Sequence, residues 1–187
     1  MHELSAELVV LLDEAGRPCG SAPKATVHHE ATPLHLAFSC WLFDTDDMTG
    51  TGARVLLTRR AAGKRTWPLA WTNAFCGHPA PGEPLEDAVR RRGADELSVS
   101  VGQLRLALPD FRYTARMPSG VTENEVCPVF TAVLAQDPTP EPAEVDAFRW
   151  LPWHALPAEV AADRDTYSPW LRLQLPLLLA EAAQRSR

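Results

Sequence analysis

Lysine is scarce in this chain, and no surplus of positive charge makes up for it. Lys24 and Lys64 are the only lysines among 187 residues, and 24 acidic residues outnumber 18 basic ones, for a formal net charge of −6. Without an overall positive field to attract polyanions, neither a nucleic acid nor an anionic membrane surface is expected as a partner. The two isolated lysines remain candidates to contact a small anionic ligand.

Long apolar runs are also missing. Residues 170–180 form the most apolar late stretch, but they include Arg172, Gln174 and Pro176. A membrane-spanning helix needs roughly 20 apolar residues, so we expect a core helix here and no membrane anchor. The first residues, Met1-His2-Glu3-Leu4, have neither the basic nor the apolar region of a signal peptide, and we therefore expect a cytoplasmic protein.

Cysteine is sparse, and no C-x-x-C pair occurs among Cys19, Cys40, Cys76 and Cys127. This spacing argues against a zinc ribbon or a redox dithiol, and a reducing cytoplasm keeps the thiols free. A chain of this length buries roughly 70% of its unfolded surface and needs no metal to hold its core. Any metal site therefore requires another explanation.

The composition is that of an ordinary globular domain, with 45% hydrophobic and 22% charged residues. Gly82-Glu83-Pro84 and Ser168-Pro169 each predict the start of a helix, with Pro84 at the first helical position and Pro176 kinking the second helix. Apolar runs predict strands over residues 8–12, 36–43, 54–60, 123–135 and 145–151, and residues 44–52 read as a loop. Strands around a central helix, with a second helix closing the chain, predict an α/β fold with a mixed sheet, in one domain over residues 1–187.

Two glutamates and three histidines carry a possible metal site. In a strand, Glu123 and Glu125 point to the same side about 7 Å apart, and like charges that are partly removed from water need a counter-ion or a proton. Imidazoles from His28, His35 and His78 together with carboxylates are the usual ligands of zinc or manganese. The alternative is an edge strand with glutamates facing water and histidines on the surface.

The segment Cys76-Gly77-His78 places a thiol two residues from an imidazole. A thiol near cationic or metal-bound groups has a lowered pKa and becomes a proton acceptor or nucleophile. The alternative is an inert buried cysteine in a turn. A thiol-protease site is disfavoured, because so close a histidine seldom reaches the geometry of a base.

Residues 77–97 resemble the Nudix box, with Gly77, Glu83 and the segment 91–97 at its spacing. Arg92 and Asp95 occupy two positions where Nudix hydrolases carry glutamates, which leaves Glu96. A hydrolytic magnesium cluster would therefore lack ligands. The alternative role for Arg92 and Glu96 is an i,i+4 surface ion pair worth a few tenths of a kcal/mol.

Taken in order, these segments make the chain similar to the type I isopentenyl-diphosphate isomerases, a Nudix-fold family. The resemblance spans most of the chain and is carried by residues 34–39, 58–60, 71–73, 76–79, 109–113, 123–129 and 168–170. It implies a Nudix-like α/β/α sandwich with a mixed sheet. It also implies an enzyme of isoprenoid biosynthesis that interconverts isopentenyl and dimethylallyl diphosphates, so the expected partner is a small prenyl diphosphate.

The resemblance also implies roles for individual positions. Metal ligands that would hold Mn²⁺, Zn²⁺ or Mg²⁺ are His28, His35, His78, Glu123 and Glu125. Glu96 would help to hold Mg²⁺ together with the substrate diphosphate. The positions that match diphosphate contacts are Lys24, Arg60, Lys64 and Arg92.

For the chemistry, the resemblance implies that Glu125 with Tyr113 delivers a proton to the terminal methylene and that Cys76 removes another. Protonating an unactivated alkene builds a tertiary carbocation, and the aromatic face of Trp170 would stabilise it. Gly93 and Ser98 depart from the Nudix pattern, which has an apolar residue and a glycine there. Two other hypotheses stay open: a pyrophosphohydrolase, and a metal-binding or interaction domain without turnover.

Overall fold

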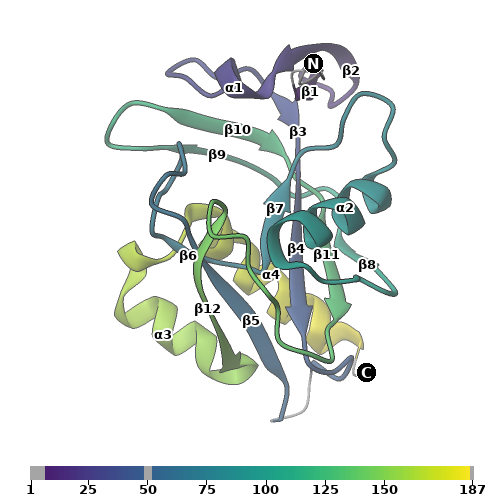
Figure 1. Ribbon diagram of the computed structural model, residues 1–187, viewed down its shortest axis with the longest axis vertical. Coiled ribbons are helices and arrows are strands. Elements are labelled where there is room, and N and C mark those ends of the chain that lie inside the picture. The colour runs from purple at the N-terminus through teal and green to yellow at the C-terminus, as the bar shows by residue number, and fades with distance from the viewer. Residues whose placement is uncertain (1–6, 49–51, 186–187) are drawn as a thin grey trace.

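The computed structural model describes residues 7–48 and 52–185, which form two mixed β-sheets with helices around them (Figure 1). The larger, seven-stranded sheet contains a parallel pair, β4 with β11, at its centre. Its path runs β12(Val145–Pro152), β5(Arg54–Arg60), β4(Phe38–Phe43), β11(Val129–Val133) and β8(Arg105–Leu108), while β6(Trp71–Thr72) pairs with β5 and β7(Phe75–Gly77) with β4.

The smaller, five-stranded sheet lies at one end of the molecule, next to the N-terminus in Figure 1. Its central pair, β3 with β10, is also parallel. The strand order is β2(Pro18–Pro23), β1(Leu8–Leu12), β3(His35–Leu36), β10(Thr122–Val126) and β9(Arg112–Arg116). The chain therefore crosses twice between the sheets, from β3 to β4 and from β10 to β11, and the two crossings run side by side.

Helices cover both faces of the larger sheet (Figure 1). In β4, Phe38, Cys40 and Leu42 belong to the core under α2(Leu85–Leu97), whereas Trp41 and Phe43 belong to the core with α3(Leu156–Ala162) and α4(Pro169–Arg185). Every residue of β4 is buried, as a strand covered on both faces requires. This layering confirms the predicted α/β/α sandwich. The remaining short helices are α1(Lys24–Val27), η1(Trp153–Ala155) and η2(Arg164–Thr166).

Several predicted boundaries are wrong. The run 123–135 is two strands in different sheets, divided at Cys127-Pro128, and the run 36–43 is divided at Ala37. Pro128 has no N–H to continue a ladder, so the chain changes sheets there. Strands over 18–23, 105–108 and 112–116 lack the apolar pattern that would have predicted them.

The helix starts are closer to expectation. Pro84 is not the first helical residue but the extended residue before α2, with ψ 140°. Ser168 caps α4 as predicted, because the backbone N–H of Leu171 donates to its Oγ at 3.3 Å. Pro176 lies inside α4, which continues to Arg185. Part of the predicted loop, residues 49–51, lies outside the described residues, and in the ranges that are described no helix is long and apolar enough to cross a bilayer.

Both departures from the Nudix pattern have a local explanation at α2. A Cβ on Gly93 would lie 2.7 Å from Val101 Cγ2 and 3.2 Å from Phe75 Cζ, so these neighbours fill the space of the missing side chain. Ser98 has φ 55° and ψ 36°, the left-handed conformation that ends many helices and favours glycine. The helix therefore ends normally, at a conformational cost.

Candidate active site

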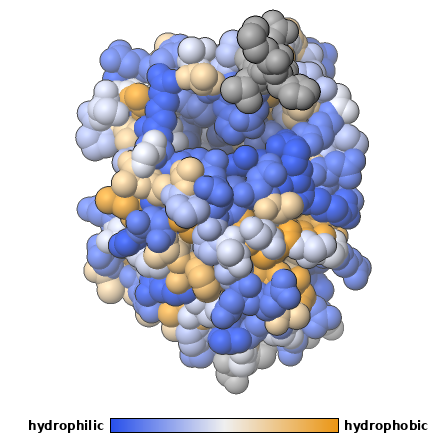
Figure 2. Space-filling model, in the orientation of Figure 1, coloured by the Kyte–Doolittle hydropathy of each residue, from blue (hydrophilic) through white to orange (hydrophobic). Residues whose placement is uncertain are grey.

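A pocket of about 410 Å³ opens between the two sheets. Figure 2 shows it as a hollow among hydrophilic residues in the upper part of this face. Nearly all of the predicted site residues line it; His35 and Glu96 are buried and contact the lining residues Glu125 and Arg92. Its polar and aromatic lining includes Glu7, Lys24, His28, Arg60, Lys64, Arg65, Cys76, His78, Arg92, Tyr113, Glu123, Glu125, Glu144 and Trp170.

Strand register brings the acidic and imidazole side chains together. In the smaller sheet Glu125 lies opposite His35 on β3 and opposite Tyr113 on β9. Directly opposed residues point to the same side of a sheet, so all three side chains converge. Glu123 and Glu125 are the buried positions of β10, as the alternation predicted.

Three imidazoles surround one carboxylate oxygen. The distances from Glu125 Oε1 are 3.2 Å to His78 Nε2, 3.4 Å to His35 Nε2 and 3.9 Å to His28 Nε2. The ligand atoms of these four residues all lie within 4.8 Å of one another. This is the size and composition of a site for one transition-metal dication.

The hydrogen bonds of His35 strengthen the case for a metal. Its Nδ1 lies 2.9 Å from the carbonyl oxygen of Pro33, which can only accept, so Nδ1 carries the hydrogen. In the neutral imidazole the lone pair of Nε2 then faces the Glu125 carboxylate, a pairing that a proton or a metal cation between them would relieve. Although burial opposes it, the contact with Glu125 raises the pKa of His35. Within the described ranges, His28 Nε2, His35 Nε2 and His78 Nδ1 are buried without a hydrogen-bond partner. The residues therefore fit a divalent metal.

Electrostatics separate the two glutamates. Burial raises the pKa of Glu125, but the polar contacts with the three neighbouring imidazoles outweigh it and hold that pKa well below its ordinary value. Burial and the neighbouring charge of Glu125 raise the pKa of Glu123. Burial lowers the pKa of His78 to about 4, which favours the neutral imidazole that binds metals.

Tyr113 joins the two carboxylates. Its hydroxyl lies 2.6 Å from Glu123 Oε2 and 2.9 Å from Glu125 Oε2, within hydrogen-bond distance of both, and its single hydrogen is donated to one of them at a time. Burial, followed by the two carboxylate charges, raises the pKa of Tyr113 well above its ordinary value, so the phenol keeps its hydrogen. Glu123 is thus linked to the four-residue histidine cluster through Tyr113 and is not one of its members.

Acids and bases pair at the other end of the pocket. Arg92 Nε donates to Glu96 Oε1 at 3.0 Å, and Arg92 Nη2 lies 3.3 Å from Glu144 Oε1, while Lys64 also bonds Glu144. The i,i+4 ion pair of Arg92 with Glu96 that was considered from the sequence is present, but both residues are buried, so its expected place on the surface is wrong. Burial raises the pKa of Glu96 despite Arg92.

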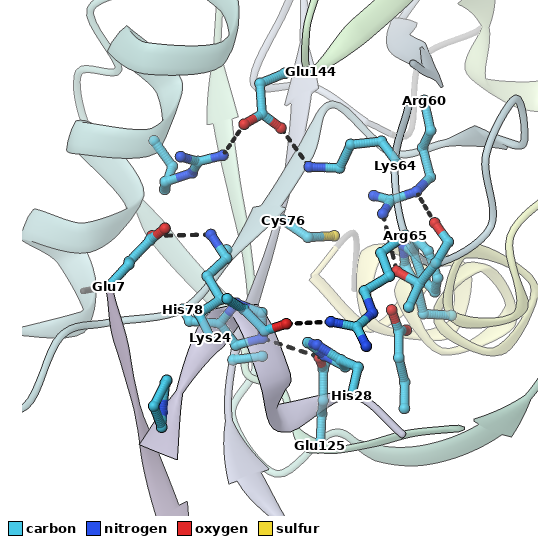
Figure 3. Close-up of a pocket in the computed structure, with 18 of the residues that line it drawn as sticks. Glu7, Lys24, His28, Arg60, Lys64, Arg65, Cys76, His78, Glu125 and Glu144 are labelled. Atoms are coloured by element: carbon cyan, nitrogen blue, oxygen red, sulfur yellow. Dashed lines mark hydrogen bonds and ion pairs between the residues drawn. The ribbon is translucent and has the colours of Figure 1, made fainter. Parts of the chain in front are cut away.

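The other basic side chains also have partners. Lys24 Nζ lies 2.9 Å from Glu7 Oε1. Arg60 Nε donates to the carbonyl of Thr66 at 3.0 Å, and its guanidinium lies 5.3 Å from the ring centroid of Trp170. Figure 3 shows Glu144 with Lys64 at one end, Glu125 with His28 and His78 at the other, and the sulfur of Cys76 between them in this view.

Cys76 is held by the larger sheet. β7 pairs with β4 so that Cys76 lies opposite Ser39, and Cys76 Sγ is 3.3 Å from Ser39 Oγ and 3.5 Å from the Asn73 amide nitrogen. Burial raises the pKa of Cys76 to about 12, opposite to the lowered pKa considered from the sequence, and hydrogen bonds from Ser39 and Asn73 oppose that rise. A Cβ on Gly77 would lie 2.8 Å from Arg92 Cγ, so this glycine lets Arg92 of α2 pack against the strand that carries the thiol.

Trp170 forms an aromatic wall of the pocket together with Tyr113. Their ring centroids are 6.1 Å apart, and Trp170 Nε1 donates to Asn73 Oδ1 at 3.0 Å. Trp67, to which the sequence assigned no role, packs edge-on against Trp170 at 5.7 Å. The pocket thus combines a cluster of possible metal ligands, a basic end, a thiol and an aromatic face.

Comparisons with known proteins identify the family. A family model described as NUDIX domain matches residues 33–171. The isopentenyl-diphosphate Delta-isomerase of Leifsonia xyli subsp. xyli is 55% identical over 181 residues, which cover 96% of this chain and 95% of the relative. The protein of that name from Mycolicibacterium vanbaalenii is 56% identical, covering 93% and 92%. The chain belongs to the isopentenyl-diphosphate Delta-isomerase family.

Solved structures confirm the Nudix fold of this family member. The Deinococcus radiodurans protein DR0079 aligns with a TM-score of 0.63 at 21% identity, covering 84% of this chain and 90% of the other. A MutT NUDIX hydrolase from Burkholderia pseudomallei aligns with a TM-score of 0.55 at 22% identity, covering 77% and 97%. At such identities the likeness concerns the fold alone.

In this isopentenyl-diphosphate isomerase family member, several polar residues in or beside the pocket had no predicted role, among them Glu7, Ser39, Arg65, Asn73, Glu144 and Gln174. The sequence did carry a signal for Ser39 and Gln174, because each is a polar residue within an apolar stretch. The structure buries both of them fully. Glu7 and Glu144 belong to segments without a motif, and only the fold brings them to the pocket.

Proposed function

We propose that this chain interconverts isopentenyl diphosphate and dimethylallyl diphosphate by two proton transfers. A proton added to the terminal methylene of isopentenyl diphosphate leaves a tertiary carbocation. Loss of a proton from the carbon next to the cationic centre, on the side of the diphosphate, forms the internal double bond. One proton enters and one leaves, so the diphosphate stays intact and no redox partner is needed.

The observation that carries the proposal is that one pocket holds two separate proton-transfer units. Tyr113, Glu123 and Glu125 form one hydrogen-bonded unit, and the raised pKa of Glu123 favours keeping a proton in it. Glu125 with Tyr113 delivers that proton to the alkene. Cys76, held in the other sheet, takes the second proton as the base.

The carbocation needs an electron-rich and unreactive surface. Trp170 is almost fully buried, and its ring and that of Tyr113 line the same pocket. A tryptophan face attracts a cation by about 0.5–2 kcal/mol without reacting with it. Trp170 is therefore assigned to stabilising the cation between the two proton transfers.

A divalent cation fits the histidine end. His28, His35, His78 and Glu125 would hold Mn²⁺, Zn²⁺ or Mg²⁺, with Glu123 as a further ligand beside them, and the imidazole content suits the first two ions best. Such an ion would supply positive charge that orients the carboxyl groups of Glu123 and Glu125 and makes them stronger acids. At the other end Glu96 would share Mg²⁺ with the substrate diphosphate.

The basic end binds the diphosphate. Lys24, Arg60, Lys64 and Arg92 all line the pocket, and phosphate oxygens would replace the carboxylate partners that some of them now have. The proposed partner is thus a small prenyl diphosphate, and the free thiol at the site suits the reducing cytoplasm, to which we assign the reaction. Hydrolysis is disfavoured, because Arg92 and Asp95 stand on α2 at two positions where Nudix hydrolases carry glutamates.

Proton NMR of the purified protein with isopentenyl diphosphate and Mg²⁺ in D₂O tests the proposal. We expect deuterated dimethylallyl diphosphate and no release of phosphate or pyrophosphate. Cys76→Ala should abolish this conversion, whereas Cys19→Ala, at an exposed thiol, should leave it unchanged. Diphosphate cleavage with an unchanged alkene would instead indicate a hydrolase, and bound metal without turnover a domain with no catalytic role.

A further inference from the structure

A line of buried polar groups connects α4 to the thiol of Cys76. Trp41 Nε1 is 2.8 Å from Gln174 Oε1, Gln174 Nε2 is 2.9 Å from Ser39 Oγ, and Ser39 Oγ is 3.3 Å from Cys76 Sγ. Trp41, Gln174 and Ser39 are all completely buried. The rest of this face of β4 and α4 is apolar, so the polar line is a costly feature that packing does not require.

The chemistry of the groups fixes the direction of the first two hydrogen bonds. The indole N–H of Trp41 can only donate, so the atom of Gln174 that it contacts is the carbonyl oxygen. The other end of that amide is then the NH₂ group, which donates to Ser39 Oγ. The single hydroxyl hydrogen of Ser39 is thereby left to point at sulfur, either Cys76 Sγ at 3.3 Å or Cys127 Sγ at 3.4 Å.

Strand register makes this contact a fixed property of the sheet. Ser39 on β4 lies opposite Cys76 on β7, so backbone pairing sets the distance between the hydroxyl and the sulfur. Asn73 contacts the same sulfur at 3.5 Å and also accepts a hydrogen bond from Trp170. The sulfur is therefore held between two polar side chains that are both tied to α4, Ser39 through Gln174 and Asn73 through Trp170.

We propose that Ser39, oriented by Gln174, is a positioning residue that directs its hydroxyl hydrogen at Cys76 Sγ and so aims the sulfur at the substrate carbon from which the proton is removed. This rests on the proposed function, in which Cys76 is the base. Ser39 contacts neither substrate nor metal ligand in this scheme. Its effect should therefore fall on the step that removes the proton and not on substrate binding.

The test measures kcat, KM and the primary isotope effect for isopentenyl diphosphate deuterated at C2, the carbon that loses the proton. We expect Ser39→Ala to lower kcat by about ten- to a hundredfold, the loss of one hydrogen bond to a charged partner. KM should stay within about twofold of the wild-type value. A fall in kcat without a change in KM indicates the loss of an interaction that is made only in the transition state. The isotope effect should rise, because removal of the C2 proton becomes more rate-limiting.

Two further variants separate positioning from a general defect. Gln174→Glu keeps the oxygen that accepts from Trp41 but turns the donor to Ser39 into an acceptor, so the hydroxyl should turn away from sulfur and the kinetics should change as in Ser39→Ala. Cys40→Ala is the matched control, because Cys40 is the next residue in β4, equally buried, and its side chain faces the α2 core. Its kcat and isotope effect should match the wild type.

The outcomes are distinct. A wild-type protein without isomerase activity would overturn the proposed function and this inference together. An active wild type with unchanged kcat and isotope effect in Ser39→Ala would overturn the inference alone. The inference would also be overturned if Cys40→Ala lowered kcat as much as Ser39→Ala does. It would equally be overturned if kcat fell in Ser39→Ala while the isotope effect stayed unchanged. Thermal unfolding of each variant shows that the compared proteins are folded.

Discussion

The two ends of the pocket handle buried charge in different ways. At the histidine end, Glu125 contacts three imidazoles, and the described residues include no lysine or arginine within ion-pair distance of it. At the basic end, Glu96 and Glu144 pair directly with Arg92 and Lys64. One end has nitrogen atoms without partners, whereas the charges of the other already compensate each other.

This difference indicates how each end binds its ligand. A dication added at the histidine end supplies the missing positive charge and separates lone pairs that now face one another. A diphosphate that binds at the basic end must replace the carboxylates as the partner of the basic side chains. Binding there is therefore an exchange of one anion for another. Removing a residue should therefore affect metal content at one end and substrate affinity at the other.

The largest effect is expected at Glu125, which serves both the metal cluster and the proton-transfer unit. Glu125→Gln keeps the size of the side chain but removes its charge and its acidity. We expect kcat to fall by about 10³-fold or more, in the range of a lost general acid. NMR rates of isomerisation measure this, and a variant with more than a tenth of wild-type activity would contradict the assignment.

A smaller but more selective effect is expected at His35. His35→Asn should weaken metal binding by at least about 100-fold, since even changes to residues behind a ligand cost 10–100-fold. Bound metal per chain, measured by elemental mass spectrometry after dialysis, should drop towards zero. His154→Asn, a histidine exposed on the surface, is the control and should keep its metal.

At the basic end the expected effect is on affinity. Lys64→Gln should raise KM about tenfold, equivalent to about 1.4 kcal/mol, with little change in kcat or in metal content. Arg92 still pairs with Glu144 in this variant, so the fold should survive. Arg90→Gln removes the same charge on the exposed side of α2, and a similar rise in its KM would show that only overall charge matters.

The smallest effect is expected away from both ends, where α2 terminates. Ser98→Gly should raise the free energy of unfolding by about 0.5–1 kcal/mol, because it relieves a left-handed conformation that costs other residues 1–2 kcal/mol. Denaturant unfolding measures the change. Ser100→Gly, at a neighbouring exposed position without a positive φ, should give no gain, and activity should stay at the wild-type level in both.

Much of the site could be predicted because its residue types are unusual where they stand. Two glutamates alternating before an apolar run, and histidines near a thiol, suggested a metal and a base, and the similarity to a family supplied the roles. Ser39 and Gln174 were assigned no role because a lone serine or glutamine in an apolar stretch does not indicate which residues it will contact. Glu144 was missed because its partners, Lys64 and Arg92, are distant in sequence.

The sequence by itself determined the layered α/β class, the family and the kinds of group available for chemistry. These depend on local patterns of apolar residues and on the order of short motifs. Only the tertiary structure decided that residues 123–135 divide between two sheets and that Arg92 and Glu96 are buried together. Strand register and the crossing of β3 and β10 into the other sheet also set the contacts among the site residues. They join residues far apart in the chain, whose distances no local pattern encodes.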